Sequence, residues 1–107
     1  MKTIEHFVNG KAFSGESKRT AKVFNPASGE QSAEVKLATT GDTNIAVENA
    51  KKAFELWSNT PPLQRARVMF RFKELIEKNS DELTKIIVAE HGKVYEDARG
   101  SLTRGLE

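Results

Sequence analysis

Residues 41–57 read GDTNIAVENAKKAFELW, and within this segment the hydrophobic period of the chain becomes helical. Apolar side chains recur at the i, i+3, i+7 and i+10 spacing of an amphipathic helix, at Val47, Ala50, Phe54 and Trp57. Asp42 is a candidate N-cap, because a short carboxylate accepts hydrogen bonds from the free N–H groups of a first helical turn. The change of period predicts an α+β chain, with strands in residues 1–40 and helices in residues 41–107.

Residues 1–40 carry the turn signals and the alternation of short strands. Asn9-Gly10 lies between two short apolar runs and predicts a tight hairpin, because both central positions of such a turn need positive φ. The segment Asn25-Pro26-Ala27-Ser28-Gly29 predicts a second turn, and apolar residues alternate before and after it. We therefore expect a small antiparallel region, in which a β-hairpin forms part of three short strands.

Three further helical patterns follow the first one. The second is expected to begin at Thr60-Pro61, with proline at its first position. Its apolar stripe consists of Ala66, Met69, Phe72 and Ile76. Ser80 is the predicted cap of the third helix, and Gly92 is the residue of positive φ at its end. The fourth pattern covers residues 95–106 and reaches the last residue without a stop signal, so we expect the segment to belong to a longer protein.

The predicted helices carry more apolar surface than the predicted strands can cover. All four helices have an apolar stripe, whereas a sheet of three short strands has one small face. No internal repeat or flexible linker divides the chain, so residues 1–107 are predicted to form a single module. Some of its apolar faces then need a partner, which is either a second copy of the chain or the rest of a longer protein.

Composition and charge argue against several classes of function. Seventeen basic and fifteen acidic residues leave a formal charge of +2, which gives no reason to expect a nucleic acid or an anionic membrane as a partner. No apolar run approaches the roughly 20 residues of a membrane span. Cysteine is absent, which excludes disulfides and a thiol nucleophile within these residues and is consistent with a cytoplasmic protein.

The side chains of the segment do not form a recognisable catalytic or metal-binding motif. The two histidines, His6 and His91, lie far apart in the sequence without a carboxylate cluster beside them, so no metal site is predicted. Neither a nucleophile elbow nor a glycine-rich phosphate loop occurs. Basic residues gather within 65–73, but Glu74 interrupts the positive strip and no aromatic side chains are interleaved for base stacking. A solvated helix face explains them better than a nucleic-acid site.

Several motifs resemble those of aldehyde dehydrogenases. Phe7-Val8-Asn9-Gly10-Lys11 and Val23-Phe24-Asn25-Pro26-Ala27-Ser28-Gly29-Glu30 are similar to the opening of that superfamily. Glu90-His91-Gly92-Lys93 matches its Glu-x-Gly-Lys. Three stretches narrow the resemblance to the coenzyme A-acylating methylmalonate-semialdehyde dehydrogenases: PPLQRARVMFRFKEL at residues 61–75, Ala89-Glu90-His91-Gly92-Lys93, and the tail Thr103-Arg104-Gly105-Leu106-Glu107. The likeness runs over nearly the whole chain and covers about the first fifth of a family member.

The resemblance implies an enzyme that depends on NAD and coenzyme A. It would convert methylmalonate or malonate semialdehyde to propionyl- or acetyl-coenzyme A with loss of carbon dioxide. The resemblance also implies that the catalytic cysteine, the catalytic glutamate and the nucleotide-binding loops lie beyond residue 107. The segment alone is then expected to be inactive and to bind neither cofactor, because the thiohemiacetal step requires a thiolate that attacks the aldehyde.

One residue of the segment is implied to contact substrate. The family holds the substrate carboxylate with an arginine in an Arg-Gly dipeptide, and Arg104-Gly105 matches this dipeptide. A guanidinium fork pairs both oxygens of a carboxylate, which lysine cannot do. Arg104 lies about 200° around the helix from Leu102 and therefore leaves the apolar stripe. The alternative is a surface arginine paired with Glu107. Gly100-Ser101-Leu102 departs from the family's Gly-Glu-Val and changes the surroundings of Arg104.

Two other roles stay open at this point. The segment can be a stand-alone, non-catalytic interaction module that binds itself or a full-length subunit through its apolar stripes. It can also be a truncation remnant without a role. The intact mass of the native protein separates both alternatives from the enzyme.

Overall fold

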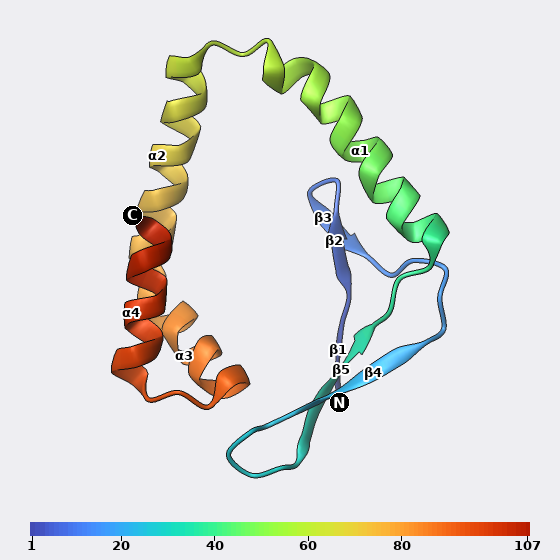
Figure 1. The fold of residues 1–107 in the computed structure, drawn as a ribbon, viewed down its shortest axis with the longest axis vertical. Helices are drawn as coiled ribbons and strands as arrows, with labels where there is room; N and C mark the ends of the chain where they lie inside the picture. Colours follow the sequence, from blue (N-terminus) through green and yellow to red (C-terminus); the bar gives the residue numbers. More distant parts are fainter. The chain divides into compact units, whose positions relative to one another are not determined.

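The chain forms five short strands followed by four helices, which confirms the predicted α+β class (Figure 1). The computed structural model describes all 107 residues. The strands are β1 (Lys2–Ile4), β2 (His6–Val8), β3 (Lys11–Phe13), β4 (Thr20–Phe24) and β5 (Gln31–Lys36). The helices are α1 (Thr40–Ser58), α2 (Pro62–Lys78), α3 (Ser80–His91) and α4 (Tyr95–Leu106).

The chain divides into two compact units. The first consists of Met1–Phe24 and Gln31–Thr60, and contains all the strands and α1. The second consists of Asn25–Glu30 and Pro61–Glu107, so the turn between β4 and β5 belongs with α2, α3 and α4. We describe each unit by itself, and the formation of a single module by residues 1–107 stays a prediction.

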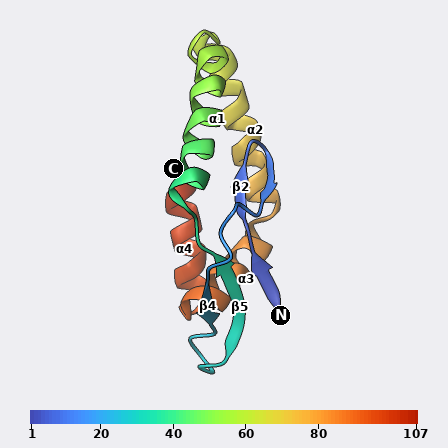
Figure 2. The same ribbon diagram turned by 90° about the vertical axis from the view of Figure 1, so that its right-hand side faces the viewer.

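The strands of the first unit differ from the expected three antiparallel strands. They form two sheets: a three-stranded sheet in the order β1-β5-β4 and a separate hairpin of β2 and β3 (Figures 1 and 2). The β4–β5 pair is antiparallel, but β1 runs parallel to β5, with Ile4 opposite Val35. Parallel strands need a long crossover connection, and local alternation carries no information about such a distant partner.

The predicted hairpin turn is confirmed, and the predicted start of α1 is corrected. Asn9 and Gly10 have φ of 55° and 76°, as a tight two-residue turn requires. The N-cap of α1 is Thr39 rather than Asp42, which stands three residues further on. Thr39 Oγ1 accepts a 3.0 Å hydrogen bond from the Asp42 backbone N–H, and Asp42 Oδ2 accepts one of 2.9 Å from Thr39 N–H. This reciprocal pair is a capping box, so the sequence pointed to the right turn but to the wrong member of the pair.

The starts of α2 and α3 also shift by one residue. Pro61 is the N-cap of α2 and Pro62 its first helical residue, since either of two consecutive prolines suits a helix start. Ser80 was expected to cap α3, but it is the first residue of that helix, and the cap position belongs to Asn79. The expected end of α3 is confirmed, because Gly92 is its C-cap with φ of 83°.

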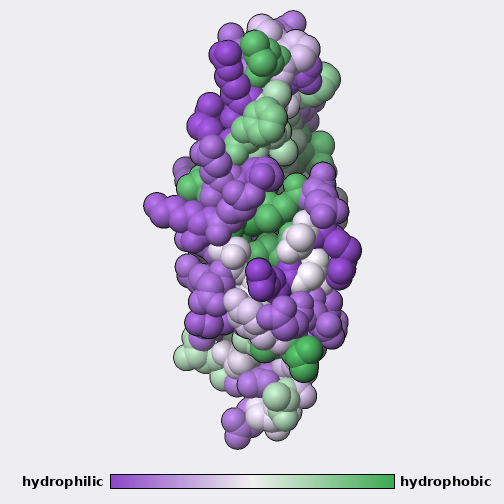
Figure 3. All heavy atoms as spheres, turned by 90° about the vertical axis from the view of Figure 1, so that its left-hand side faces the viewer, coloured by the Kyte–Doolittle hydropathy of each residue, from purple (hydrophilic) through white to green (hydrophobic).

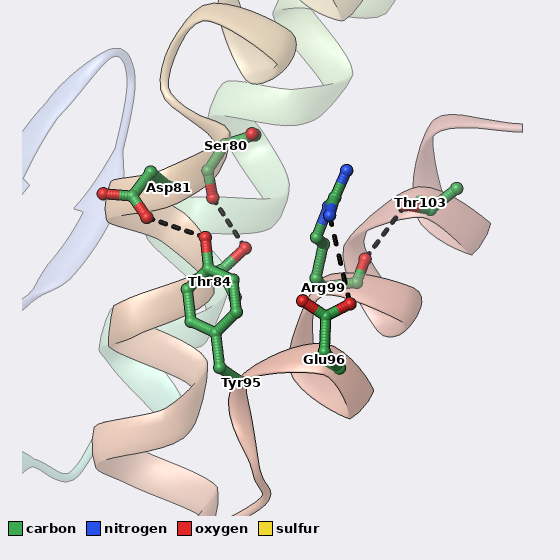
Figure 4. A network of polar contacts seen from close by, with 7 residues as sticks. All are labelled: Ser80, Asp81, Thr84, Tyr95, Glu96, Arg99 and Thr103. Carbon is green, nitrogen blue, oxygen red and sulfur yellow. Dashed lines mark hydrogen bonds and ion pairs between the residues drawn. The ribbon is translucent and has the colours of Figure 1, made fainter.

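In the second unit, α3 and α4 pack against each other through small side chains. Thr84 of α3 and Ala98 of α4 are fully buried. The Thr84 hydroxyl satisfies its hydrogen bond within α3, where it donates to the carbonyl oxygen of Ser80 at 2.7 Å (Figure 4). Small side chains at buried positions on both helices allow the helices to pack closely.

Few apolar side chains are buried in either unit. Ala33 and Ala98 are the only hydrophobic residues that are almost completely buried, whereas Leu56 is 78% exposed and Phe54 is 66% exposed. The face shown in Figure 3 has hydrophobic side chains open at the surface between hydrophilic ones. Exposed apolar surface on this scale is typical of a surface that packs against something else. No helix combines the length and the apolar character that a membrane crossing requires.

Candidate functional site

Arg104, the predicted substrate-binding residue, lies in the last turn of α4 with an exposed side chain. Its guanidinium folds back along the helix, where Nη2 donates a hydrogen bond of 3.3 Å to Ser101 Oγ. A Cβ atom on Gly100 would lie 3.4 Å from Arg104 Nη1, at ordinary van der Waals contact with this conformation. Leu102 is half-buried, which agrees with the expectation that Arg104 leaves the apolar stripe.

The alternative pairing of Arg104 with Glu107 does not form. The structure contains three ion pairs, and all three join neighbouring turns of one helix: Lys73–Glu77, Lys85–Asp81 and Arg99–Glu96. Arg104 therefore has no carboxylate within 4.0 Å, and its only side-chain hydrogen bond goes to a neutral hydroxyl. Its charge is left available for an anion from outside these residues, and its contact with substrate stays a prediction.

A second cation reaches the same hydroxyl. Lys93 Nζ donates a hydrogen bond of 2.8 Å to Ser101 Oγ, and Ser101 Oγ donates one of 3.3 Å to the carbonyl oxygen of Asp97. Sequence analysis missed Lys93, because it lies in the loop between α3 and α4, eight residues before its acceptor. The signals were its place beside Gly92, the predicted turn at the end of α3, and its position in the motif Glu90-His91-Gly92-Lys93.

The position of Lys93 is fixed by the packing of its loop. The positive φ of Gly92 turns the chain away from α3, and a Cβ atom there would lie 3.0 Å from Pro26 Cγ in the β4–β5 turn. On the other side of the loop, Tyr95 OH donates to Asp81 Oδ1 at 2.7 Å and ties the start of α4 to the first turn of α3 (Figure 4). Lys93 thus lies between Gly92, which packs against Pro26, and Tyr95, which is hydrogen-bonded to Asp81.

The other residues weighed in the sequence do not converge on a site. No group of three or more histidine, cysteine, aspartate or glutamate side chains is arranged to hold a metal ion. Within the basic stretch of α2, Lys73 is paired with Glu77 at 2.7 Å, and Arg65 is half-buried with an unpaired Nε. The grooves of the molecule are mainly apolar. One of about 790 Å³ lies along α1, and one of about 440 Å³ lies between α2 and the end of α4.

The chain belongs to the aldehyde dehydrogenase family, whose family model matches residues 13–107. Within that family it is similar to the malonate-semialdehyde dehydrogenase of Pseudomonas aeruginosa, with 45% identity over 107 residues, which is 100% of this chain and 21% of the relative. A second such enzyme, malonate-semialdehyde dehydrogenase 2 of Oceanobacillus iheyensis, is 37% identical over the whole chain and 22% of its own length.

Solved structures of the same kind share the fold. The methylmalonate-semialdehyde dehydrogenase of Oceanimonas doudoroffii superposes with a TM-score of 0.95 and 50% identity, over 99% of this chain and 22% of that one. A Sinorhizobium meliloti protein, described as a methylmalonate-semialdehyde dehydrogenase and crystallised with NAD, has a TM-score of 0.96 and 43% identity over the same shares. The chain matches the N-terminal part of these structures and spans about a fifth of their length.

Proposed function

We propose that residues 1–107 are the N-terminal part of an oxidoreductase that converts malonate or methylmalonate semialdehyde to acetyl- or propionyl-coenzyme A, with NAD as oxidant and release of carbon dioxide. The observation that carries this proposal is the 45% identity with a malonate-semialdehyde dehydrogenase over the whole chain. Membership of the aldehyde dehydrogenase family supports the oxidoreductase class. The substrate and coenzyme A follow from the resemblance to this branch of the family.

Arg104 is proposed to hold the carboxylate of the semialdehyde. Its guanidinium has no carboxylate partner in the structure, and it makes one hydrogen bond, of 3.3 Å, to a neutral oxygen. An arginine fork supplies parallel N–H donors that match the two oxygens of a carboxylate. A simple aldehyde such as propanal has no carboxylate, so this contact would separate the two kinds of substrate.

The chemistry itself is proposed to take place in the remaining part of the enzyme. Residues 1–107 contain no cysteine for attack on the aldehyde and no glycine-rich loop for the phosphates of NAD or coenzyme A. The Sinorhizobium meliloti structure was determined with NAD, which supports use of that cofactor by the complete enzyme. The residues of this segment do not fit a site for either cofactor, and we assign no catalytic step to them.

The exposed apolar faces are proposed to pack against the rest of the enzyme. The groove along α1 is lined by Ala50, Ala53, Phe54, Leu56, Trp57 and Thr60. The relatives are about five times as long as this chain, so they contain polypeptide that can cover such a groove. A second copy of the chain would cover it when the rest is missing. Cytoplasmic location, without nucleic acid or membrane partners, completes the proposal.

Two measurements test the proposal. The first is the intact mass of the native protein in its source cell. A mass about five times the 11.9 kDa of this chain agrees with the enzyme, whereas a native mass of 11.9 kDa favours an interaction module or a remnant. The second is turnover of malonate semialdehyde. The native protein should form acetyl-coenzyme A only with both NAD and coenzyme A present, and purified residues 1–107 should form none. Turnover by the purified 107-residue chain would refute the assignment.

A further inference from the structure

Two cationic side chains converge on a single oxygen atom in the second unit. Lys93 Nζ lies 2.8 Å and Arg104 Nη2 lies 3.3 Å from Ser101 Oγ. The three residues come from different parts of the α3–α4 arrangement: Lys93 from the connecting loop, Ser101 from the middle of α4 and Arg104 from its last turn. We call these three residues the Lys93–Ser101–Arg104 cluster.

The hydrogen bonds of the cluster fix its centre and leave its donors unused. A serine hydroxyl offers one donor and two acceptor lone pairs. Ser101 Oγ donates to the Asp97 carbonyl oxygen at 3.3 Å and accepts from both cations, so its capacity is fully used. An ammonium has three donors and a guanidinium has five. Because Lys93 and Arg104 each spend donors only on Ser101, most of their N–H groups point to no partner in the chain.

No negative charge balances the cluster. Neither Lys93 nor Arg104 has a carboxylate oxygen within 4.0 Å, although the chain carries fifteen acidic residues. Asp97, one turn before Ser101, contributes its backbone carbonyl oxygen rather than an ion pair. The helix C-terminus adds a partial negative charge near Arg104, which is smaller than a full carboxylate. Two positive charges around one neutral oxygen, with free donors, form an arrangement that an anion would complete.

We propose that Lys93 is a second anion-binding residue, and that Ser101 is a positioning residue that holds it beside Arg104 to form one carboxylate site. This inference rests on the proposed role of Arg104. In the resulting site Arg104 supplies the fork for the carboxylate, and Lys93 adds a point charge that strengthens the attraction. Ser101 keeps the two cations together, although their mutual repulsion would otherwise drive the flexible side chains apart.

The first test measures anion binding without enzyme activity. Malonate is titrated into isotope-labelled residues 1–107 at low ionic strength, with malonamide as an uncharged control, and the NMR signals of residues 93, 101 and 104 are followed. Malonate should shift these signals, and malonamide should not. Lys93→Met and Ser101→Ala should each weaken malonate binding roughly threefold to tenfold, because each removes or misplaces one of two charges. Lys93→Arg and Ser101→Thr keep the charge or the hydroxyl and should retain most of the binding.

Unchanged malonate binding in both Lys93→Met and Ser101→Ala would overturn the proposal. The absence of any malonate shift in a chain with a dispersed, folded spectrum would overturn it too.

A kinetic cycle in the full-length protein separates this inference from the function of Arg104. Lys93→Met should raise the KM for malonate semialdehyde and leave the kinetics of propanal unchanged. The same substitution should have little further effect in an Arg104→Leu background, because both residues serve one carboxylate. Arg104→Leu could raise the KM for malonate semialdehyde more than that for propanal while Lys93→Met affects both aldehydes equally. In that case the inference fails and the proposed function stands. If Arg104→Leu shows no selectivity, the proposed substrate contact itself is wrong.

Discussion

The phenolic oxygen of Tyr95 donates a hydrogen bond of 2.7 Å to Asp81 Oδ1 and so ties the first residue of α4 to the first turn of α3 (Figure 4). Lys85 approaches the other oxygen of the same carboxylate at 2.9 Å. Hydrogen bonds from Lys85 and Tyr95 lower the pKa of Asp81, and the bond to Asp81 raises the pKa of Tyr95 above its usual 10.0. This contact spans the loop that carries Lys93.

Asp81→Ala should therefore lower the pKa of Tyr95 toward its usual value. The chain has a single tyrosine, so the absorbance of the phenolate during a pH titration reports this residue alone. Lys85→Ala is the matched control. The positive charge of Lys85 favours the phenolate, so its removal should move the Tyr95 pKa upward. An unchanged tyrosine titration in Asp81→Ala would mean that the hydrogen bond does not persist in solution.

Thr39→Ala should destabilise the first unit by about 1 kcal/mol, which is the typical cost of removing an N-cap hydroxyl. The substitution removes the 3.0 Å hydrogen bond from Asp42 N–H to Thr39 Oγ1 at the start of α1. Urea unfolding followed by circular dichroism measures the change. Thr40→Ala is the control, because this neighbouring side chain is exposed and should alter the stability by no more than about 0.5 kcal/mol. Equal losses in the two variants would argue against the cap.

The stability of the first unit should fall in acid through Asp42. Its carboxylate accepts backbone hydrogen bonds from Thr39 and Glu16, both at 2.9 Å, and these bonds lower its pKa below the usual 3.8. A depressed pKa in the folded state means that the carboxylate stabilises the fold at any pH above its unfolded value. This contribution is lost as the pH falls through the lower folded value. Unfolding curves between pH 7 and pH 2 should show the loss in the wild type, and Asp42→Asn should flatten it.

Arg104→Leu in the full-length protein should raise the KM for malonate semialdehyde far more than that for propanal. Losing a charge-assisted bidentate pair should reduce selectivity by about 30- to 1000-fold. Arg104→Lys should restore only part of it, because an ammonium lacks the fork. Arg99→Leu is the control, since this arginine lies about 140° around the helix and is paired with Glu96 at 3.9 Å. Equal effects of Arg104→Leu on both aldehydes would assign the residue to the fold instead.

Isolated residues 1–107 should self-associate through the apolar groove along α1. Leu56 and Phe54 are exposed there, and Trp57 is the only tryptophan, so its fluorescence reports burial of the groove. Sedimentation should show dimers or larger species at high micromolar concentration, with a shift of the tryptophan emission to shorter wavelength. Leu56→Ser should weaken the association, and the exposed Lys51→Ser on the same helix should not. A compact monomer that binds no apolar dye would contradict this expectation.

The helices and turns were largely predictable because their signals are local. The positive φ of Asn9, Gly10 and Gly92 follows from residue type within a turn. The helix starts were missed by one to three residues at Thr39, Pro61 and Asn79. At Thr39 the capping box decides the start, whereas Pro61 and Asn79 make no side-chain cap hydrogen bond, and the first backbone hydrogen bonds to their carbonyl oxygens decide it.

The sequence by itself determined that this chain is an α+β segment whose helices carry apolar stripes, and its motifs pointed to the aldehyde dehydrogenase family. Only the tertiary structure decided that β1 lies parallel to β5, because that pairing joins strands about thirty residues apart. It alone also brought Lys93 to Ser101 and Arg104. Periodicity placed Arg104 on a helix face with Ser101 one turn before it, but the approach of Lys93 depends on the path of the loop between Gly92 and the start of α4. A loop path of this kind joins residues through space, and the residue types of the loop do not record it.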